Sequence, residues 1–153
     1  MGKMVEILRE IGMIARALDS ISNIEFKEVD LIRGQYLYIV RICEHPGITP
    51  VELADMIKVD KATTVKALKK LEKIGLITQT VDKKNNRTKK IYPTAKGEEV
   101  HPFIARENEY SNRVALDGFT EAEAQQLKDY LERVRINIED DWYHVEKGNQ
   151  RIY

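Results

Sequence analysis

The 153-residue sequence has little of several features that define other classes of protein. Its single cysteine, Cys43, excludes an internal disulfide and any multi-cysteine metal site. No apolar run approaches the ~18 residues that cross a bilayer. Glu6, Arg9 and Glu10 interrupt the stretch where a signal peptide would be apolar. Glycine and proline are also sparse, which favours helix. We therefore expect a cytoplasmic, mostly helical protein with no membrane partner.

Residue sets that carry catalysis are missing as well. The sequence has no nucleophile with a base and an orienting group, no glycine-rich phosphate loop and no paired acids in a recognisable frame. The three histidines lack the i, i+4 spacing of zinc ligands on a helix, and ordinary surface histidines are the favoured interpretation: His45, His101 and His144. Cys43 lies in an apolar segment, which favours a buried, inert thiol over a redox sensor. We expect no enzyme activity and no cofactor, with metal- or thiol-gated regulation as an alternative.

Charge is distributed unevenly along a chain whose formal net charge is zero. Residues 58–90 contain eleven Lys or Arg against three Asp or Glu, a net charge of +8, and the rest of the chain carries −8. A basic block in an acidic frame indicates a localised surface for a polyanion. A solvated lysine-rich helix face is the simpler alternative on charge alone.

Hydrophobic spacing and capping residues predict several helices. Thr49-Pro50-Val51-Glu52 is a capping box for a short helix, and Asp60 is a good N-cap for the next one. Val65, Leu68 and Leu71 are expected on the buried side of that second helix, which ends at Gly75. Residues 23–30 are interpreted as a polar break. The other expected helices cover residues 4–22, 31–44, 94–117 and 121–142.

A short β-hairpin is expected directly after the basic helix. Residues 76–81 are rich in β-branched and apolar side chains, and residues 89–92 return as the second strand. The polar stretch 82–87 between them is predicted to be the turn, with Asn85-Asn86 at its tip. A capped short helix, a tight turn, a basic helix and a polar hairpin together predict a winged helix-turn-helix.

This arrangement is suited to duplex DNA, because a helix fits the major groove and a basic hairpin can reach the minor groove. Thr hydroxyls can bond to base edges, and lysines suit phosphates. We expect the recognition helix, at about residues 61–74, to contact DNA through Lys61, Thr63, Thr64, Lys66 and Lys70. The wing, at about residues 76–92, would use Lys83, Lys84, Arg87 and Lys89. A winged module that packs only against protein is the alternative function.

At these residues the sequence resembles the MarR family of transcriptional regulators. The resemblance covers nearly the whole chain. It is carried by Gln35 to Gly47, Glu52-Leu53-Ala54, Val59-Asp60-Lys61-Ala62-Thr63-Thr64-Val65, Leu71-Glu72-Lys73-Ile74-Gly75-Leu76-Ile77 and Thr94-Ala95-Lys96-Gly97. The wing departs from the family's D-x-R-D-x-R pattern. It reads Asp82-Lys83-Lys84-Asn85-Asn86-Arg87, so Lys84 takes the place of an arginine expected at the minor groove.

The resemblance implies a mostly α fold with a small β-hairpin wing, in which a winged helix-turn-helix lobe at residues 31–98 stands on a helical dimerisation base. Residues 1–30 and 99–153 would form that base. Apolar stripes agree with a homodimer interface through Leu8, Ile11, Leu18, Leu127, Leu131, Val134 and Ile138. The implied function is a repressor that binds a pseudo-palindromic operator and is released by a small-molecule effector. Residues that could bind a phenolic or acidic effector are Arg16, Tyr36 and Arg41.

Overall fold

The computed structural model describes residues 2–31, 33–82 and 84–153. Within these residues the elements are α1 (Ile7–Glu25), the 3-10 helix η1 (Lys27–Val29), α2 (Gln35–Glu44), α3 (Pro50–Ile57), α4 (Lys61–Lys73), β1 (Ile77–Asp82), β2 (Asn85–Pro93), α5 (Ala95–Ala115) and α6 (Glu121–Glu146). The expected fold class, mostly helical with a small β-hairpin, is confirmed. No helix in the described part of the chain is both long and apolar enough to cross a membrane.

The chain divides into two compact units, residues 1–107 and 108–153. The helix α5 runs from the first unit into the second. This division is geometric. The expected division into a DNA-binding lobe at residues 31–98 and a dimerisation region concerns function, and it stays a prediction.

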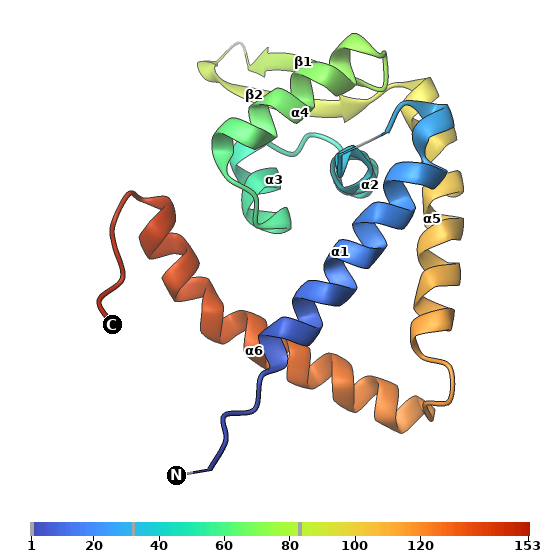
Figure 1. The fold of residues 1–153 in the computed structure, drawn as a ribbon. Helices are drawn as coiled ribbons and strands as arrows, with labels where there is room; N and C mark the ends of the chain where they lie inside the picture. The colour runs from blue at the N-terminus through green and yellow to red at the C-terminus, as the bar shows by residue number, and fades with distance from the viewer. Residues whose placement is uncertain (1, 32, 83) are drawn as a thin grey trace. The chain divides into compact units, whose positions relative to one another are not determined.

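The core of the first unit lies where α2, α3, α4 and the hairpin meet (Figure 1). Its fully buried side chains include Ile39, Ile42, Leu53, Leu68, Leu71, Ile77 and Ile91. The segment between α2 and α3 is tied to β2 by two backbone hydrogen bonds. The Gly47 N–H donates to the Ile91 carbonyl over 2.7 Å, and the Ile91 N–H donates to the Ile48 carbonyl over 2.9 Å. The hairpin is therefore joined to the helices through β2.

The predicted polar break at residues 23–30 is wrong. Helix α1 continues to Glu25, and η1 follows it. Between them, Phe26 is fully buried, with its ring centroid 5.2 Å from that of Tyr36 and 5.7 Å from that of Phe103. Phe26 anchors this segment, because it buries a large apolar area and forms one tilted and one edge-on ring contact.

Capping residues set the tight connection from α3 to α4. The Thr49 hydroxyl accepts a hydrogen bond from the Glu52 N–H over 3.2 Å, while the Glu52 carboxylate accepts from that hydroxyl rather than from the Thr49 N–H. At the other end of α3, Lys58 adopts a left-handed backbone with φ 62°, and the Val59 N–H reaches back to the Ala54 carbonyl. The connection from α3 to α4 therefore takes three residues, as predicted.

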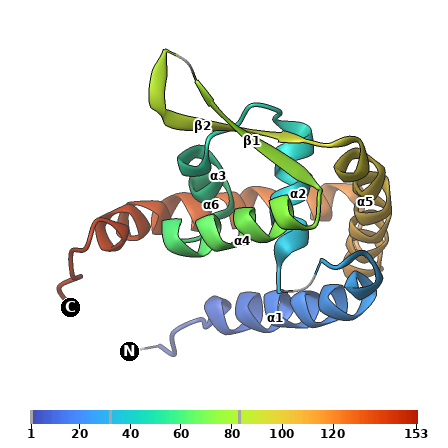
Figure 2. The same cartoon turned by 90° about the horizontal axis from the view of Figure 1, so that it is seen from above.

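The hairpin is longer than the sequence indicated. Strand β1 pairs antiparallel with β2 from Ile77 opposite Pro93 to Asp82 opposite Asn85, with an irregularity after Val81. Only two residues therefore separate the paired strands, and the predicted turn with its tip at Asn85-Asn86 is wrong. The pairing extends into polar residues because it is made by backbone N–H and carbonyl groups, whatever the side chains. The strand ends that flank the turn project beyond the helices (Figure 2).

Helix α6, the main element of the second unit, begins at the predicted capping box. The Thr120 hydroxyl accepts from the Glu123 N–H over 3.1 Å, and the Glu123 carboxylate accepts from the Thr120 N–H over 2.9 Å. Gly118, with φ 80°, supplies the left-handed turn after α5. None of the 26 residues of α6 is buried.

Candidate nucleic-acid interface

Helix α4 has one buried face and one basic face. The buried face is made by Thr64, Ala67, Leu68 and Leu71, which recur at i, i+3, i+4 and i+7. The opposite side exposes Lys61, Thr63, Lys66, Lys69, Lys70 and Lys73. Among the residues that the structure describes, no acidic side chain forms an ion pair with these lysines. The basic face is therefore open to an external polyanion.

The prediction that Thr64 lies on the exposed face is wrong. Its side chain has no accessible surface, and its hydroxyl donates to the Asp60 carbonyl over 2.9 Å. The same hydroxyl is a hydrogen-bond partner of the buried Tyr38 from α2. Val65, expected in the core, is instead exposed over 37% of its surface. Thr64 was expected to be exposed because it is polar. Its spacing from Ala67, Leu68 and Leu71 nevertheless places it on the buried face.

Asp60 and Thr63 form the first turn of α4. One oxygen of the Asp60 carboxylate accepts from the Thr63 N–H over 2.9 Å, and the other accepts from the Thr63 hydroxyl over 2.6 Å. These hydrogen bonds, first the one from the hydroxyl and then the one from the backbone, lower the pKa of the Asp60 carboxyl. Asp60 thus caps the helix as predicted, and it stays ionised at neutral pH.

The hairpin adds further positive charge next to this helix. Lys84, Lys89 and Lys90 are exposed, and Lys89 pairs through its backbone with Val81. Lys83 lies outside the described residues. Arg87 belongs to β2, and its side chain also lies outside the description. Lys84 and Lys89 therefore share a basic ribbon, while the contribution of Lys83 and Arg87 stays a prediction.

The three residues expected to bind an effector have different surroundings. Tyr36 is buried, and its hydroxyl donates to the Asp19 carboxylate over 3.2 Å. Burial, with a smaller contribution from that carboxylate, raises the pKa of Tyr36. Arg41 is exposed and donates to Glu44 over 2.8 Å, and Arg16 is exposed on α1. Tyr36 is thus a core residue rather than the wall of an open crevice, and the effector role of the three stays a prediction.

Cys43 is half-buried on α2, with its sulfur 3.8 Å from the Gly97 carbonyl oxygen. Burial, followed by the nearby Glu98 and Glu44 carboxylates, raises the pKa of the Cys43 thiol from 9.0 to about 11. The thiol is therefore protonated at neutral pH, and a thiol is a poor nucleophile compared with its thiolate. Within the described ranges, no three His, Cys, Asp or Glu side chains gather as they would around a metal ion.

The expected dimer residues are open to solvent in the single chain. Those on α1 (Leu8 and Leu18) and on α6 (Leu127, Leu131 and Ile138) are exposed, and Ile11 and Val134 are half-buried. Of the residues of α1, only Ser22 is buried. The apolar stripes of both helices are therefore largely uncovered.

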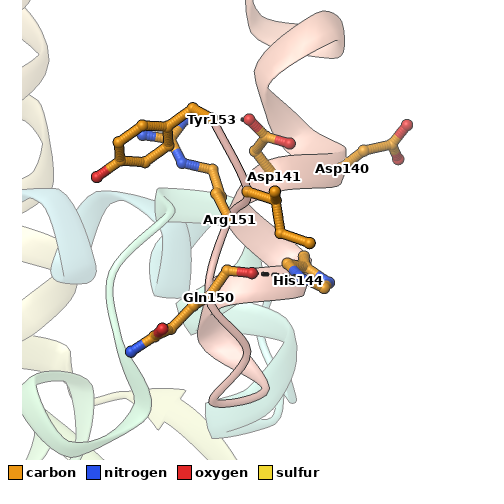
Figure 3. A pocket seen from close by; sticks show the side chains of 7 residues that line it. Asp140, Asp141, His144, Gln150, Arg151 and Tyr153 are labelled. Carbon is orange, nitrogen blue, oxygen red and sulfur yellow. Dashed lines mark hydrogen bonds and ion pairs between the residues drawn. The ribbon is translucent and has the colours of Figure 1, made fainter.

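A shallow hollow in the second unit is formed where the C-terminal segment folds back along α6 (Figure 3). The Arg151 guanidinium donates to the Asp141 carboxylate over 3.0 Å, and the His144 Nε2 lies 3.1 Å from the Gln150 carbonyl oxygen. All four side chains are exposed. The polar groups are engaged with one another, so the hollow is a weaker candidate for a binding site than α4.

Comparisons with known proteins agree on one family. The MarR family profile matches residues 31–89. The chain is 59% identical over 150 residues to YybA, an uncharacterized HTH-type transcriptional regulator of Bacillus subtilis, covering 98% of this chain and 100% of YybA.

Solved structures give the same answer. A MarR family regulator from Listeria monocytogenes, complexed with 26mer DNA, is 57% identical, with a TM-score of 0.95 over 98% of this chain and 100% of that one. A MarR protein from Peptoclostridium difficile is 41% identical, with a TM-score of 0.88 over 95% of this chain and 98% of that one.

Proposed function

Because the chain belongs to the MarR family of transcriptional regulators, we propose that it binds duplex DNA with α4 in the major groove and the β1–β2 hairpin on the adjacent backbone or minor groove. The observation that carries this proposal is the basic face of α4, whose lysines have no acidic partner among the described residues. A helix has the width to enter the ~12 Å major groove, and lysines on its sides can reach phosphates.

Two further observations support DNA as the polyanion. The caps at Thr49 and Asp60 and the three-residue turn define the ends of α3 and α4 and the short connection between them. In a helix-turn-helix, such a pair of helices positions the second helix against the groove. The Listeria regulator, 57% identical to this chain, was solved complexed with 26mer DNA.

The functional unit that we propose is a homodimer. Helix α6 is 26 residues long and buries none of them, and α1 buries only Ser22. Single chains rarely leave apolar stripes of this length in water. A second copy of the chain would cover Leu8, Ile11, Leu18, Leu127, Leu131, Val134 and Ile138. Such a dimer presents two recognition helices to half-sites that are ~10 base pairs apart.

Regulation is proposed to be repression, with release by a small acidic or phenolic molecule. A dimer bound across a promoter excludes other proteins from the same duplex, which is the simplest consequence of the proposed interface. A molecule that changed the spacing of the two recognition helices would break their match to the half-sites. We also propose that this activity is cytoplasmic.

Salt dependence tests the assignment of α4. In the variant Lys61→Gln, Lys66→Gln, Lys70→Gln, we expect weaker binding to duplex DNA and a smaller slope of log K against log salt, by about 0.9 for each lost phosphate contact. The control variant Lys3→Gln, Lys27→Gln, Lys147→Gln removes equal charge from exposed positions elsewhere. Equal affinities and slopes for the two variants would contradict the proposed interface.

A further inference from the structure

The first turn of α4 presents an unusual set of hydrogen-bonding groups. Thr63 is exposed, yet its hydroxyl lies 2.6 Å from one oxygen of the Asp60 carboxylate. The other carboxylate oxygen is occupied by the Thr63 N–H over 2.9 Å. A carboxylate and a hydroxyl in this geometry share one proton, and its position decides what Thr63 can offer to a ligand.

The proton of that hydrogen bond must come from Thr63. An ionised carboxylate has only acceptor sites, so the hydroxyl is the sole available donor of the pair. The bonds from Thr63 lower the pKa of Asp60, which keeps the carboxylate ionised across the neutral range. A charge-assisted O–H···O⁻ bond of this length is stronger than a neutral one.

The carboxylate itself cannot easily turn away from the hydroxyl. Its second oxygen is held by the Thr63 N–H, and that N–H is fixed by the helix backbone. The donor of Thr63 is therefore used inside the protein. What this exposed residue can still offer to a ligand is an oxygen lone pair and a methyl group.

We propose that Thr63 is a specificity-determining residue that reads an exocyclic amino group in the major groove, the N6 amino group of adenine or the N4 amino group of cytosine. This inference rests on the proposed DNA-binding function. Those amino groups are the hydrogen-bond donors on the major-groove edges of the bases. Guanine O6 and N7 and thymine O4 are acceptors, and the occupied hydroxyl has no proton for them.

The proposal gives Thr63 and the lysines of α4 different roles. Every base pair places one amino group in the major groove, so an acceptor-only side chain specifies which strand carries adenine or cytosine at that position. The lysines of the same face are donors, and they supply the contacts to phosphates and to acceptor edges. Thr63 would thereby contribute orientation and base preference, while the lysines contribute most of the sequence-independent affinity.

The proposal is tested by combining deletion of single amino groups in the DNA with substitution of Thr63. The DNA is the duplex that the wild-type protein selects from a random pool. In turn, each adenine of that duplex is replaced by purine, and each cytosine by 2-pyrimidinone, analogues that lack the amino group. We expect one position in each half-site at which this deletion weakens wild-type binding about tenfold, as for one lost base contact. For Thr63→Val the same deletion should change binding less than twofold, because the acceptor is already gone.

Two variants of Thr63 separate the contribution of its hydroxyl from that of its methyl group. Thr63→Val retains a β-branched side chain of similar volume at an exposed site, and its thermal unfolding is measured alongside. Thr63→Ser retains the hydroxyl and loses the methyl group, so it should restore the wild-type penalty for amino deletion. Replacing thymine by uracil removes the base methyl group and separates an apolar contact from the hydrogen bond.

Several results would overturn the proposal. If Thr63→Val and the wild type respond equally to every amino deletion, Thr63 reads no amino group. If Thr63 couples instead to loss of guanine N7, through 7-deazaguanine, the hydroxyl donates to DNA and the Asp60 bond does not hold. Failure of the wild type to select any duplex would remove the proposed function as well, whereas a selected duplex without coupling removes only this inference.

Discussion

The α-carbon of Gly97 lies so close to the Leu76 carbonyl that a Cβ built on it would stand 2.2 Å from that oxygen. Thr94 completes the contact. Its N–H donates to the same oxygen over 3.0 Å, and its hydroxyl donates to the Gly75 carbonyl over 2.6 Å while accepting from the Gly97 N–H. The Thr-x-x-Gly pattern thus packs the start of α5 directly against the entry to β1.

Gly97→Ala is expected to destabilise the protein by about 1–3 kcal/mol, because a methyl group cannot be placed there without moving backbone. The measurement is the free energy of unfolding in urea. Gly12→Ala is the matched control, since Gly12 lies within α1 and its nearest neighbours are the flexible atoms of Arg16. There alanine should stabilise by about 0.5–1 kcal/mol. Equal effects at the two sites would contradict the close packing of Gly97.

Thr64→Val should destabilise the protein by about 1–3 kcal/mol even though valine fills the same space. The change removes the bond to the Asp60 carbonyl and takes a buried partner from Tyr38. Thr63→Val, one residue earlier on the exposed face, should shift the free energy of unfolding by only about 0.5 kcal/mol. If the two variants are equally stable, Thr64 is not the buried connection between α2 and α4.

Local signals made much of this fold predictable from sequence. Thr49, Asp60 and Thr120 cap the helices that they were expected to cap, because an N-cap depends only on the side chain and the next three residues. The order of helices, the three-residue turn and the existence of the hairpin follow from the same local chemistry. The family motifs extended these signals to a complete fold.

Features set by distant contacts were not predictable in the same way. Thr64 is buried against Tyr38 of α2, and Phe26 is buried against Phe103 of α5. Neither partner is visible from neighbouring residues. The acceptor-only state of Thr63 depends on a side-chain bond to Asp60, which a residue pattern cannot show. At the candidate interface, sequence therefore identified the exposed lysines but misplaced one of the two threonines.

Cys43 should react slowly with alkylating reagents in the folded protein. With its pKa raised to about 11, the thiolate fraction at pH 8 is about 0.1%, against about 10% for an unfolded chain whose cysteine has a pKa of 9.0. Alkylation by iodoacetamide, followed by mass spectrometry, should be at least about 100-fold slower than in urea. The rate should rise with pH up to about 11. Rapid alkylation at pH 7 would favour the thiol-gated alternative.

Leu131→Glu should convert the protein from dimer to monomer, because it places a charge in the apolar stripe of α6. Ile136→Glu is the matched control, since Ile136 is also exposed on α6 but lies on the opposite side of the helix from that stripe. Sedimentation equilibrium measures both. A monomeric wild type, or equal dissociation of the two variants, would contradict the proposed interface.

The most direct test of the central claim is the selection of bound duplexes from a random-sequence pool at two salt concentrations. A dimer that reads DNA through α4 should recover an inverted repeat with half-sites ~10 base pairs apart, and higher salt should weaken binding without changing the selected sequence. Recovery of unrelated sequences, with binding that vanishes as salt rises, would show that only the lysines engage DNA and would contradict sequence-specific reading by this helix.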